Sequence, residues 1–194
     1  MKVIILAALA FVVGSIPTGM LIAQVRGLDL RKTGSGNIGA TNVLRSAGKW
    51  PALFTLVGDM LKGAIAASAG RYFLAGQFSL EGMVGLCAIL GHDFSLFLKF
   101  KGGKGVATGI GVLSVYSPQT ALVTIIIWLM TVLLTRYSSL GALVSFGLMP
   151  LGMVAFDRKE KVPVALLMTI LVFMRHRDNI SRLIKGTEPT VGKR

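Results

Sequence analysis

Long apolar segments alternate with short polar segments along almost the whole chain. Seven segments are predominantly apolar, and they cover residues 3–25, 50–69, 80–90, 106–116, 119–135, 140–156 and 162–174. About 20 apolar residues in an α-helix cross the ~30 Å hydrocarbon core of a bilayer. The pattern predicts an all-α integral membrane protein, a polytopic bundle of about seven transmembrane helices forming one domain, residues 1–194. Three segments are short, so their helices are expected to extend into flanking residues, to tilt, or to end beside a polar cavity.

The first two apolar segments carry residues that interrupt a simple membrane helix. Pro17 and Gly19 are expected to kink the first helix. Lys2 before an apolar run is also typical of a signal peptide, but further apolar segments follow, so the first is interpreted as an anchor. Asp59 and Lys62 are three residues apart in the second segment and share a helix face. We expect them to pair with each other; a direct role in substrate binding is the alternative.

Composition supports the membrane class, and the charge distribution predicts the topology. Hydrophobic residues make up 53% and charged residues 15% of the chain, against about 25% charged residues in soluble domains. Most of the 21 lysines and arginines lie in residues 26–49, 98–104, 135–139 and 175–194. Seven crossings place these segments on one side, which the positive-inside rule assigns to the cytoplasm, with the N-terminus outside. The basic residues lie between apolar runs, so the +13 net charge does not indicate nucleic-acid binding.

A re-entrant pair formed by the third and fourth apolar segments is the alternative topology. It would leave five spans and place the basic residues 98–104 on the wrong side, so seven spans are preferred. The single cysteine, Cys87, excludes an intrachain disulfide, and His92 and His176 are far apart with no cysteine cluster nearby. The sequence therefore predicts no metal site.

The segment Lys101-Gly102-Gly103-Lys104-Gly105 is the most distinctive polar sequence. Successive glycines allow backbone N–H groups to converge on an anion, and lysines add charges suited to phosphate. The segment precedes an apolar helix, whose N-terminus also favours anions. A phosphate site at the membrane surface is one interpretation, and a flexible basic turn is the other. A Walker A loop is excluded because Gly105, not serine or threonine, follows Lys104.

A second polar cluster covers residues 31–45. Its glycines at 34, 36 and 39 match the dinucleotide-binding spacing, but that motif requires a preceding strand and a βαβ unit, which a position between membrane spans excludes. Arg45 is suited to a phosphate or carboxylate, and it shares a helix face with Thr41. The alternative is a capped loop with Arg45 at lipid headgroups. The short polar side chains of this cluster are Ser35, Asn37, Thr41 and Asn42.

Two further clusters lie near the C-terminal half of the bundle. Residues 136–139 contain Arg136 and Ser139; the alternative is an arginine that only orients the chain in the membrane and a serine that caps a helix. Residues 175–188 place His176 and Asn179 three apart, and Gly186 is expected to end a helix. A basic amphipathic tail on anionic lipid is the alternative interpretation of this last cluster.

Taken together, residues 33–42, 91–108 and 175–188 resemble the three motifs of the bacterial PlsY family, the acyl-phosphate-dependent glycerol-3-phosphate acyltransferases. The resemblance covers the whole chain. One departure is Ser95, which follows Phe94 where many members have proline; we expect it to affect the helix end rather than the chemistry.

The resemblance implies transfer of a fatty acyl group from acyl phosphate to the sn-1 hydroxyl of glycerol 3-phosphate, giving lysophosphatidic acid and inorganic phosphate in phospholipid synthesis. It implies a bacterial cytoplasmic (inner) membrane enzyme with a cytoplasmic active site. No cofactor, metal or nucleic acid is expected; the partners are the two substrates and membrane lipid, and a monomer is expected. The implied catalytic residues are Ser35, His92, His176 and Asn179. The implied substrate-binding residues are Gly36, Asn37, Thr41, Asn42, Arg45, Gly102, Gly103, Lys104, Gly105 and Ser139.

The mechanism implied by this resemblance has open points. Direct attack by the glycerol-phosphate hydroxyl is favoured, with Ser35 binding phosphate or the oxyanion, because a covalent serine needs a neighbouring base. A neutral histidine or a substrate phosphate oxygen is the proton acceptor. Glu188 is interpreted as structural.

Two other classes of protein fit parts of the pattern. A carrier or channel for phosphate-like anions also uses helix N-termini, but the clusters lie on one face and no inverted repeat is apparent. A structural subunit bound to anionic lipid would tolerate single changes at Ser35 or Lys104.

Overall fold

Every apolar segment forms a helix in the computed structural model, which describes residues 1–192. Within that range all regular elements are helices. The long or apolar ones are α1 (Lys2–Ser15), α2 (Thr18–Gln24), α4 (Lys49–Phe73), α5 (Phe78–Asp93), α6 (Val106–Tyr116), α7 (Pro118–Thr135), α8 (Ser138–Phe156) and α9 (Val162–Arg175). Two short amphipathic helices, α3 (Ala40–Ala47) and α10 (Arg177–Ile184), and two 3-10 turns, Leu96–Leu98 and Lys159–Lys161, complete the fold.

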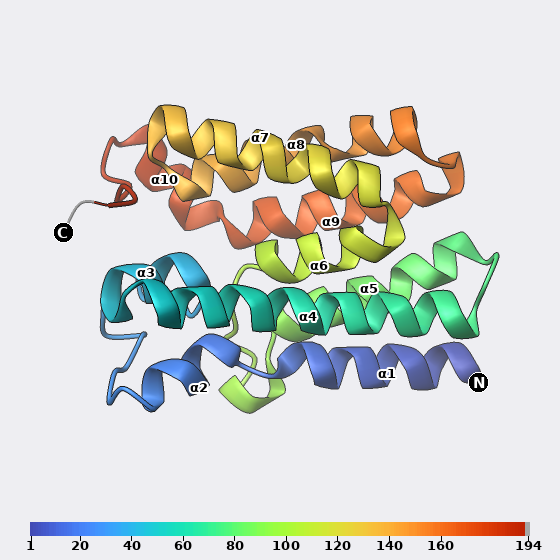
Figure 1. The fold of residues 1–194 in the computed structure, drawn as a ribbon, viewed down its shortest axis with the longest axis horizontal. Helices are drawn as coiled ribbons and strands as arrows, with labels where there is room; N and C mark the ends of the chain where they lie inside the picture. Colours follow the sequence, from blue (N-terminus) through green and yellow to red (C-terminus); the bar gives the residue numbers. More distant parts are fainter. Residues whose placement is uncertain (193–194) are drawn as a thin grey trace.

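The apolar helices run back and forth along one common direction (Figure 1). The N-terminus lies at one end of this bundle, and α3, α10 and the loops that adjoin them collect at the opposite end. In the part of the chain that the structure describes, five helical segments are long and apolar enough to cross a membrane: Lys2–Gln24, Lys49–Phe73, Phe78–Leu98, Pro118–Thr135 and Ser138–Phe156. The prediction of an all-helical integral membrane protein is confirmed. Of the seven apolar segments, those that form α6 and α9 are shorter helices of 11 and 14 residues.

The first helix is interrupted where the sequence predicts a kink. α1 ends at Ser15 and α2 begins at Thr18, with Pro17 between them. At the break, the carbonyl of Ile16 accepts from the N–H of Thr18 and from the buried amine of Lys62, each at 3.0 Å. Lys62 also lies 2.8 Å from the carboxylate of Asp59. The predicted pairing of Asp59 with Lys62 is therefore confirmed, and the same lysine also donates to the backbone at the break.

Small residues allow the helix backbones to touch. A Cβ atom added to Gly63 of α4 would lie 2.1 Å from the carbonyl oxygen of Thr108 in α6, and one added to Gly111 of α6 would lie 1.9 Å from that of Met60 in α4. Gly14 of α1 and Gly91 of α5 show the same reciprocal approach. Membrane helices associate through such contacts because lipid provides no hydrophobic force between them.

Two further local predictions can be compared with the structure. α10 ends at Ile184 and Gly186 has a φ of +68°, which confirms the predicted helix stop. Ser95, which was expected to affect the helix end, is buried, and its hydroxyl donates to the carbonyl of Ser15 at 2.5 Å. The side chain thus joins the end of α5 to the end of α1.

Candidate active site

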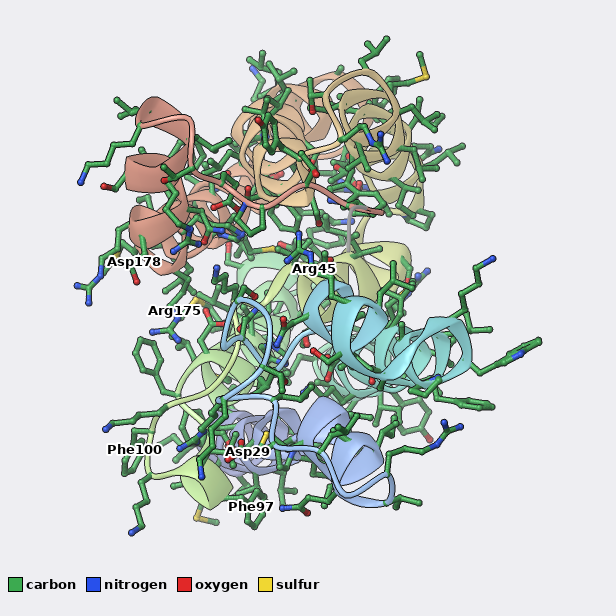
Figure 2. All side chains as sticks on the ribbon, turned by 90° about the vertical axis from the view of Figure 1, so that its left-hand side faces the viewer. Asp29, Arg45, Phe97, Phe100, Arg175 and Asp178 are labelled. Carbon is green, nitrogen blue, oxygen red and sulfur yellow. The ribbon has the colours of Figure 1, made fainter. Side chains whose placement is uncertain are left out.

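A cavity of about 440 Å³ opens at the polar end of the bundle. It lies where α3, the start of α6, the start of α8 and the C-terminal segments meet (Figure 2). Eleven of the fourteen site residues expected from the sequence line it: Ser35, Asn37, Thr41, Asn42, Arg45, His92, Lys104, Gly105, Ser139, His176 and Asn179. Gly36, Gly102 and Gly103 do not line it. The fold thus brings together residues that are up to 144 positions apart in the sequence.

Asn42 organises the loop that precedes α3. Its side-chain oxygen accepts the N–H of Ser35 at 2.8 Å, and its side-chain nitrogen donates to the carbonyls of Leu30, Thr33 and Asn37 at 3.2, 3.0 and 2.8 Å. Asn42 was expected to bind substrate, but both ends of its amide are used within the loop. Its side chain therefore shapes the loop that presents Ser35 and Asn37 to the cavity.

The glycine-rich segment differs from the expected phosphate cradle. The N–H of Gly102 donates to the carbonyl of Asp93 at 3.1 Å, and the N–H of Gly103 donates to that of His92 at 2.9 Å. These two amides are therefore not available to an anion, and neither glycine contacts the cavity. The lining begins one residue later, with Lys104 and Gly105, where α6 starts. The first N–H groups of a helix have no partner inside the helix, so the N–H groups at the start of α6, not those of Gly102 and Gly103, are the ones suited to an anion.

Gly103 is required by close packing instead. A Cβ atom on this residue would lie 2.1 Å from Nε2 of His92, so only glycine lets the loop cross the imidazole ring. His92 in turn is buried, with Nδ1 at 3.6 Å from the Asp59 carboxylate. The imidazole ring thus packs against the loop and also lines the cavity.

A hydrogen-bonded network connects the basic residues on the C-terminal side. Lys104 donates to the side-chain oxygen of Asn179, and Asn179 donates to Glu188 at 2.6 Å. Glu188 also accepts from Ser139 at 2.6 Å and from Arg182 at 2.7 Å. Burial works against ionisation, but these three hydrogen bonds lower the pKa of Glu188 below its usual value. Glu188 therefore carries a negative charge that holds Ser139 and Asn179 in place.

Arg45 reaches the same region from α3. Its Nη2 atom donates to the carbonyl of Pro189 at 3.0 Å, and its Nε atom is buried without a partner in the described part of the chain. Figure 2 shows Arg45 between α3 and the C-terminal segments. An unsatisfied guanidinium N–H in a cavity wall is suited to an anionic ligand.

The protonation states of two groups follow from their surroundings. Burial and the positive charge of Arg182 lower the pKa of Lys104 to about 8, so the amine is mostly charged at pH 7. Burial and the charge of Lys104 lower the pKa of His176 to about 4, so this ring is neutral. Its Nδ1 lies 2.7 Å from the carbonyl of Val172, which can only accept. Nδ1 therefore carries the proton, and Nε2 is left as an acceptor.

The other side of the cavity is apolar. It is lined by Leu53, Leu56 and Met60 of α4, Ile110 of α6, and Ile125, Trp128 and Leu129 of α7. α4 and α7 both pack on α6, so α6 forms the floor of a groove between them. Such a cavity suits a ligand with a phosphate head and a hydrocarbon chain. Arg45 and Lys104 line one side, and the other side is formed by apolar residues of α4, α6 and α7.

Two acidic residues of this cavity were not among the site residues expected from the sequence. Glu188 was interpreted as structural; it lies in the cavity wall and accepts hydrogen bonds from two other wall residues, Ser139 and Asn179. Asp59 was expected to pair with Lys62, with a direct role in substrate binding as the alternative; it makes the ion pair and also lines the cavity beside His92. The position of Asp59 inside an apolar segment was the only available signal. Within residues 1–192, no group of three or more His, Cys, Asp or Glu side chains is placed to hold a metal ion.

The fold and the cavity define an integral membrane protein whose polar end combines cationic groups with an apolar groove. The family model described as glycerol-3-phosphate acyltransferase matches residues 4–186. The glycerol-3-phosphate acyltransferases of Geobacter sulfurreducens and Thermus thermophilus are each 46% identical, over 95% and 96% of this chain and 95% and 94% of theirs.

Two crystal structures of PlsY (YgiH), an integral membrane glycerol 3-phosphate acyltransferase, have the same fold. The glycerol 3-phosphate form has a TM-score of 0.94 and 38% identity, and covers 99% of this chain and 96% of that one. The lysophosphatidic acid form has a TM-score of 0.92 and 37% identity, over 98% and 95% of the two chains. The chain therefore belongs to the glycerol-3-phosphate acyltransferase family, and it is a membrane acyltransferase of phospholipid synthesis.

Proposed function

We propose that this enzyme transfers a fatty acyl group from acyl phosphate to the sn-1 hydroxyl of glycerol 3-phosphate, releasing lysophosphatidic acid and inorganic phosphate. The observation that carries the proposal is the cavity itself, with Arg45, Lys104 and the start of α6 on one side and the groove between α4 and α7 on the other. Both substrates carry a phosphate group, and one carries a hydrocarbon chain. The relatives named above are called glycerol-3-phosphate acyltransferases, which supports glycerol 3-phosphate as the acceptor.

The reaction requires little covalent chemistry from the protein. The sn-1 oxygen attacks the acyl carbon, the bond from that carbon to the phosphate oxygen breaks, and the hydroxyl proton passes to Nε2 of His176 or to a phosphate oxygen. An acyl phosphate is a mixed anhydride with a good leaving group, so positioning and charge neutralisation are the main contributions. Ser35 binds phosphate or the oxyanion. No hydrogen bond joins its hydroxyl to His92 or His176 among residues 1–192, which favours direct attack over an acyl-serine.

The same proposal includes the cellular setting. The protein acts as a monomer and a single domain in the bacterial cytoplasmic membrane, with its N-terminus outside and its polar end in the cytoplasm, without a cofactor. The excess of lysine and arginine in the loops at the polar end supports this orientation. Glycerol 3-phosphate then enters from the cytoplasm, and the acyl donor enters from the lipid.

The purified protein in lipid is expected to acylate labelled glycerol 3-phosphate with palmitoyl phosphate and not with palmitoyl-CoA. Lysophosphatidic acid is measured by chromatography of the lipid extract, with protein-free vesicles as the control for spontaneous transfer. Equal product from palmitoyl-CoA would contradict the proposed donor. No product from either donor would contradict the proposed reaction.

The rate is expected to fall as the pH rises through about 8. Lys104 loses its proton there, because its pKa is lowered to about 8, and the cavity then loses a cation that binds phosphate. The profile to measure is kcat/KM for glycerol 3-phosphate, since it reports the free enzyme. In Lys104→Arg the guanidinium stays charged at all accessible pH values, so the alkaline decline is expected to move upward by two or more pH units, to a pH above about 10. An unchanged decline near pH 8 would show that another group is responsible.

A further inference from the structure

The last residue of α9 contacts the glycine-rich loop although it lies outside the cavity wall. Arg175 donates to the carbonyl of Gly103 through Nε at 3.1 Å and through Nη2 at 2.8 Å, and Nη2 lies 3.4 Å from the carbonyl of Gly102. Figure 2 shows Arg175 on the side of the molecule where the loop after α5 meets the C-terminal helices. The contact joins segments about 70 residues apart and fixes two carbonyl groups of the loop.

The N–H groups of the same two glycines are held from the opposite direction. Gly102 and Gly103 donate to the carbonyls of Asp93 and His92 at the end of α5. α5 therefore holds the N–H groups of these two glycines, and Arg175 holds their carbonyl groups. Gly103 is buried and its φ is not in the left-handed region, so contacts with these neighbours, not local strain, determine the orientation of its peptide.

Peptide geometry transmits this orientation to the next residue. The carbonyl of Gly103 and the N–H of Lys104 belong to one planar, trans peptide unit, so they point in opposite directions. When Arg175 holds the carbonyl, the N–H of Lys104 points away from Arg175. Lys104 is the first residue of the loop that lines the cavity. The guanidinium thus fixes the orientation of the peptide that leads into α6.

The guanidinium is itself held in place. Its central carbon lies 5.1 Å from the centre of the Phe94 ring, a distance typical of a cation–π contact. The planar fork of arginine donates through two nitrogens while it stacks on an aromatic ring, which a lysine ammonium cannot do. Phe94 follows directly after α5, so the stack connects Arg175 to the helix that holds the other side of the loop.

We infer that Arg175 is a positioning residue for phosphate binding, acting through Gly102, Gly103 and Lys104 without touching substrate. The inference rests on the proposed function in so far as the ligand is glycerol 3-phosphate. Arg175 was not among the site residues expected from the sequence, because its own cluster gave no indication of a contact with the glycine-rich loop.

Arg175→Lys tests the inference, since it keeps the charge and the aliphatic part of the side chain. The expected result is a rise of about tenfold in KM for glycerol 3-phosphate with kcat reduced less than threefold. Hydrogen exchange of the amides of residues 99–106, measured by mass spectrometry on the same samples, is expected to become about tenfold faster, with α1 and α7 unchanged. Arg177→Lys is the matched control, because Arg177 lies two residues later and its side chain is 85% exposed.

A second variant and a double mutant complete the test. Phe94→Leu removes the stack and leaves the hydrogen bonds, so a smaller change in the same direction is expected. In the Lys104→Ala background, Arg175→Lys is expected to lower kcat/KM less than twofold further, because the two residues act in one unit. Full additivity, or a uniform loss of kcat with unchanged KM, would overturn the positioning role.

The exchange experiment separates this inference from the proposed function. Unchanged exchange of residues 99–106 in Arg175→Lys would overturn the inference even if the wild-type enzyme acylates glycerol 3-phosphate normally. Faster exchange confined to this loop, in a protein that forms no lysophosphatidic acid, would support the contact between Arg175 and the loop and contradict only the proposed reaction.

Discussion

Replacing Lys104 with alanine is expected to lower kcat/KM for glycerol 3-phosphate by about 30- to 1,000-fold, which corresponds to about 2–4 kcal/mol. The amine is mostly buried, lines the cavity and lies at the start of α6. Its removal takes away a cation where the phosphate is proposed to bind, and it leaves the side-chain oxygen of Asn179 without its donor. Initial rates with labelled glycerol 3-phosphate, at saturating palmitoyl phosphate, measure the effect.

Lys101→Ala is the matched control for this prediction. Lys101 lies in the same loop, but its side chain is exposed and does not line the cavity. Its backbone carbonyl, which accepts from Arg31, is retained in the variant. We expect a change of less than about twofold. If Lys104→Ala kept wild-type kcat/KM, the assignment of the phosphate site to the start of α6 would be wrong.

Replacing Gly63 with alanine is expected to destabilise the fold by about 3 kcal/mol. The new Cβ would lie 2.1 Å from the carbonyl oxygen of Thr108, and backbone cannot rotate away as a side chain can. α4 and α6 would have to separate in the first turn of α6, next to Lys104. A decrease of about 6–12 °C in Tm is expected for a chain of this size, measured as the loss of monodisperse protein on size-exclusion chromatography after heating.

Gly147→Ala provides the control for the packing argument. Gly147 also lies inside an apolar helix, α8, but a Cβ there would meet only ring carbons of Phe173, at 3.5 and 3.6 Å. That is ordinary van der Waals contact, so Tm should change by less than about 2 °C. Equal losses in the two variants would show that helix glycines stabilise this fold for a reason other than backbone contact.

Much of the fold could be predicted because it depends on short-range patterns. The apolar segments at 106–116, 119–135 and 140–156 are helices within one or two residues of their expected bounds. Pro17 interrupts the first helix because it lacks an N–H group, and Asp59 pairs with Lys62 because three residues bring side chains to one helix face. The third segment is longer than its apolar part, since α5 continues through the polar residues His92 and Asp93, which neighbouring helices bury.

The roles of individual polar groups depend on contacts that no local pattern contains. The composition of the glycine-rich segment correctly indicated a loop. The directions of its N–H and carbonyl groups, however, are set by other elements: α5 accepts the N–H groups, and Arg175 of α9 donates to the carbonyl groups. Asn42 has a side chain that often binds ligands, yet its amide group is hydrogen-bonded to three carbonyls and one N–H of its own loop.

The sequence by itself therefore determined the membrane class, the helices and the chemical content of the polar loops, because hydrophobic period and residue type are local properties. The tertiary structure alone decided which of those polar groups remain free. A buried donor or acceptor is satisfied by whichever partner lies within about 3 Å, and for Gly102, Gly103 and Glu188 those partners come from other helices. The cationic wall and the apolar groove of the cavity likewise depend on how α4, α6, α7 and the C-terminal segments pack together.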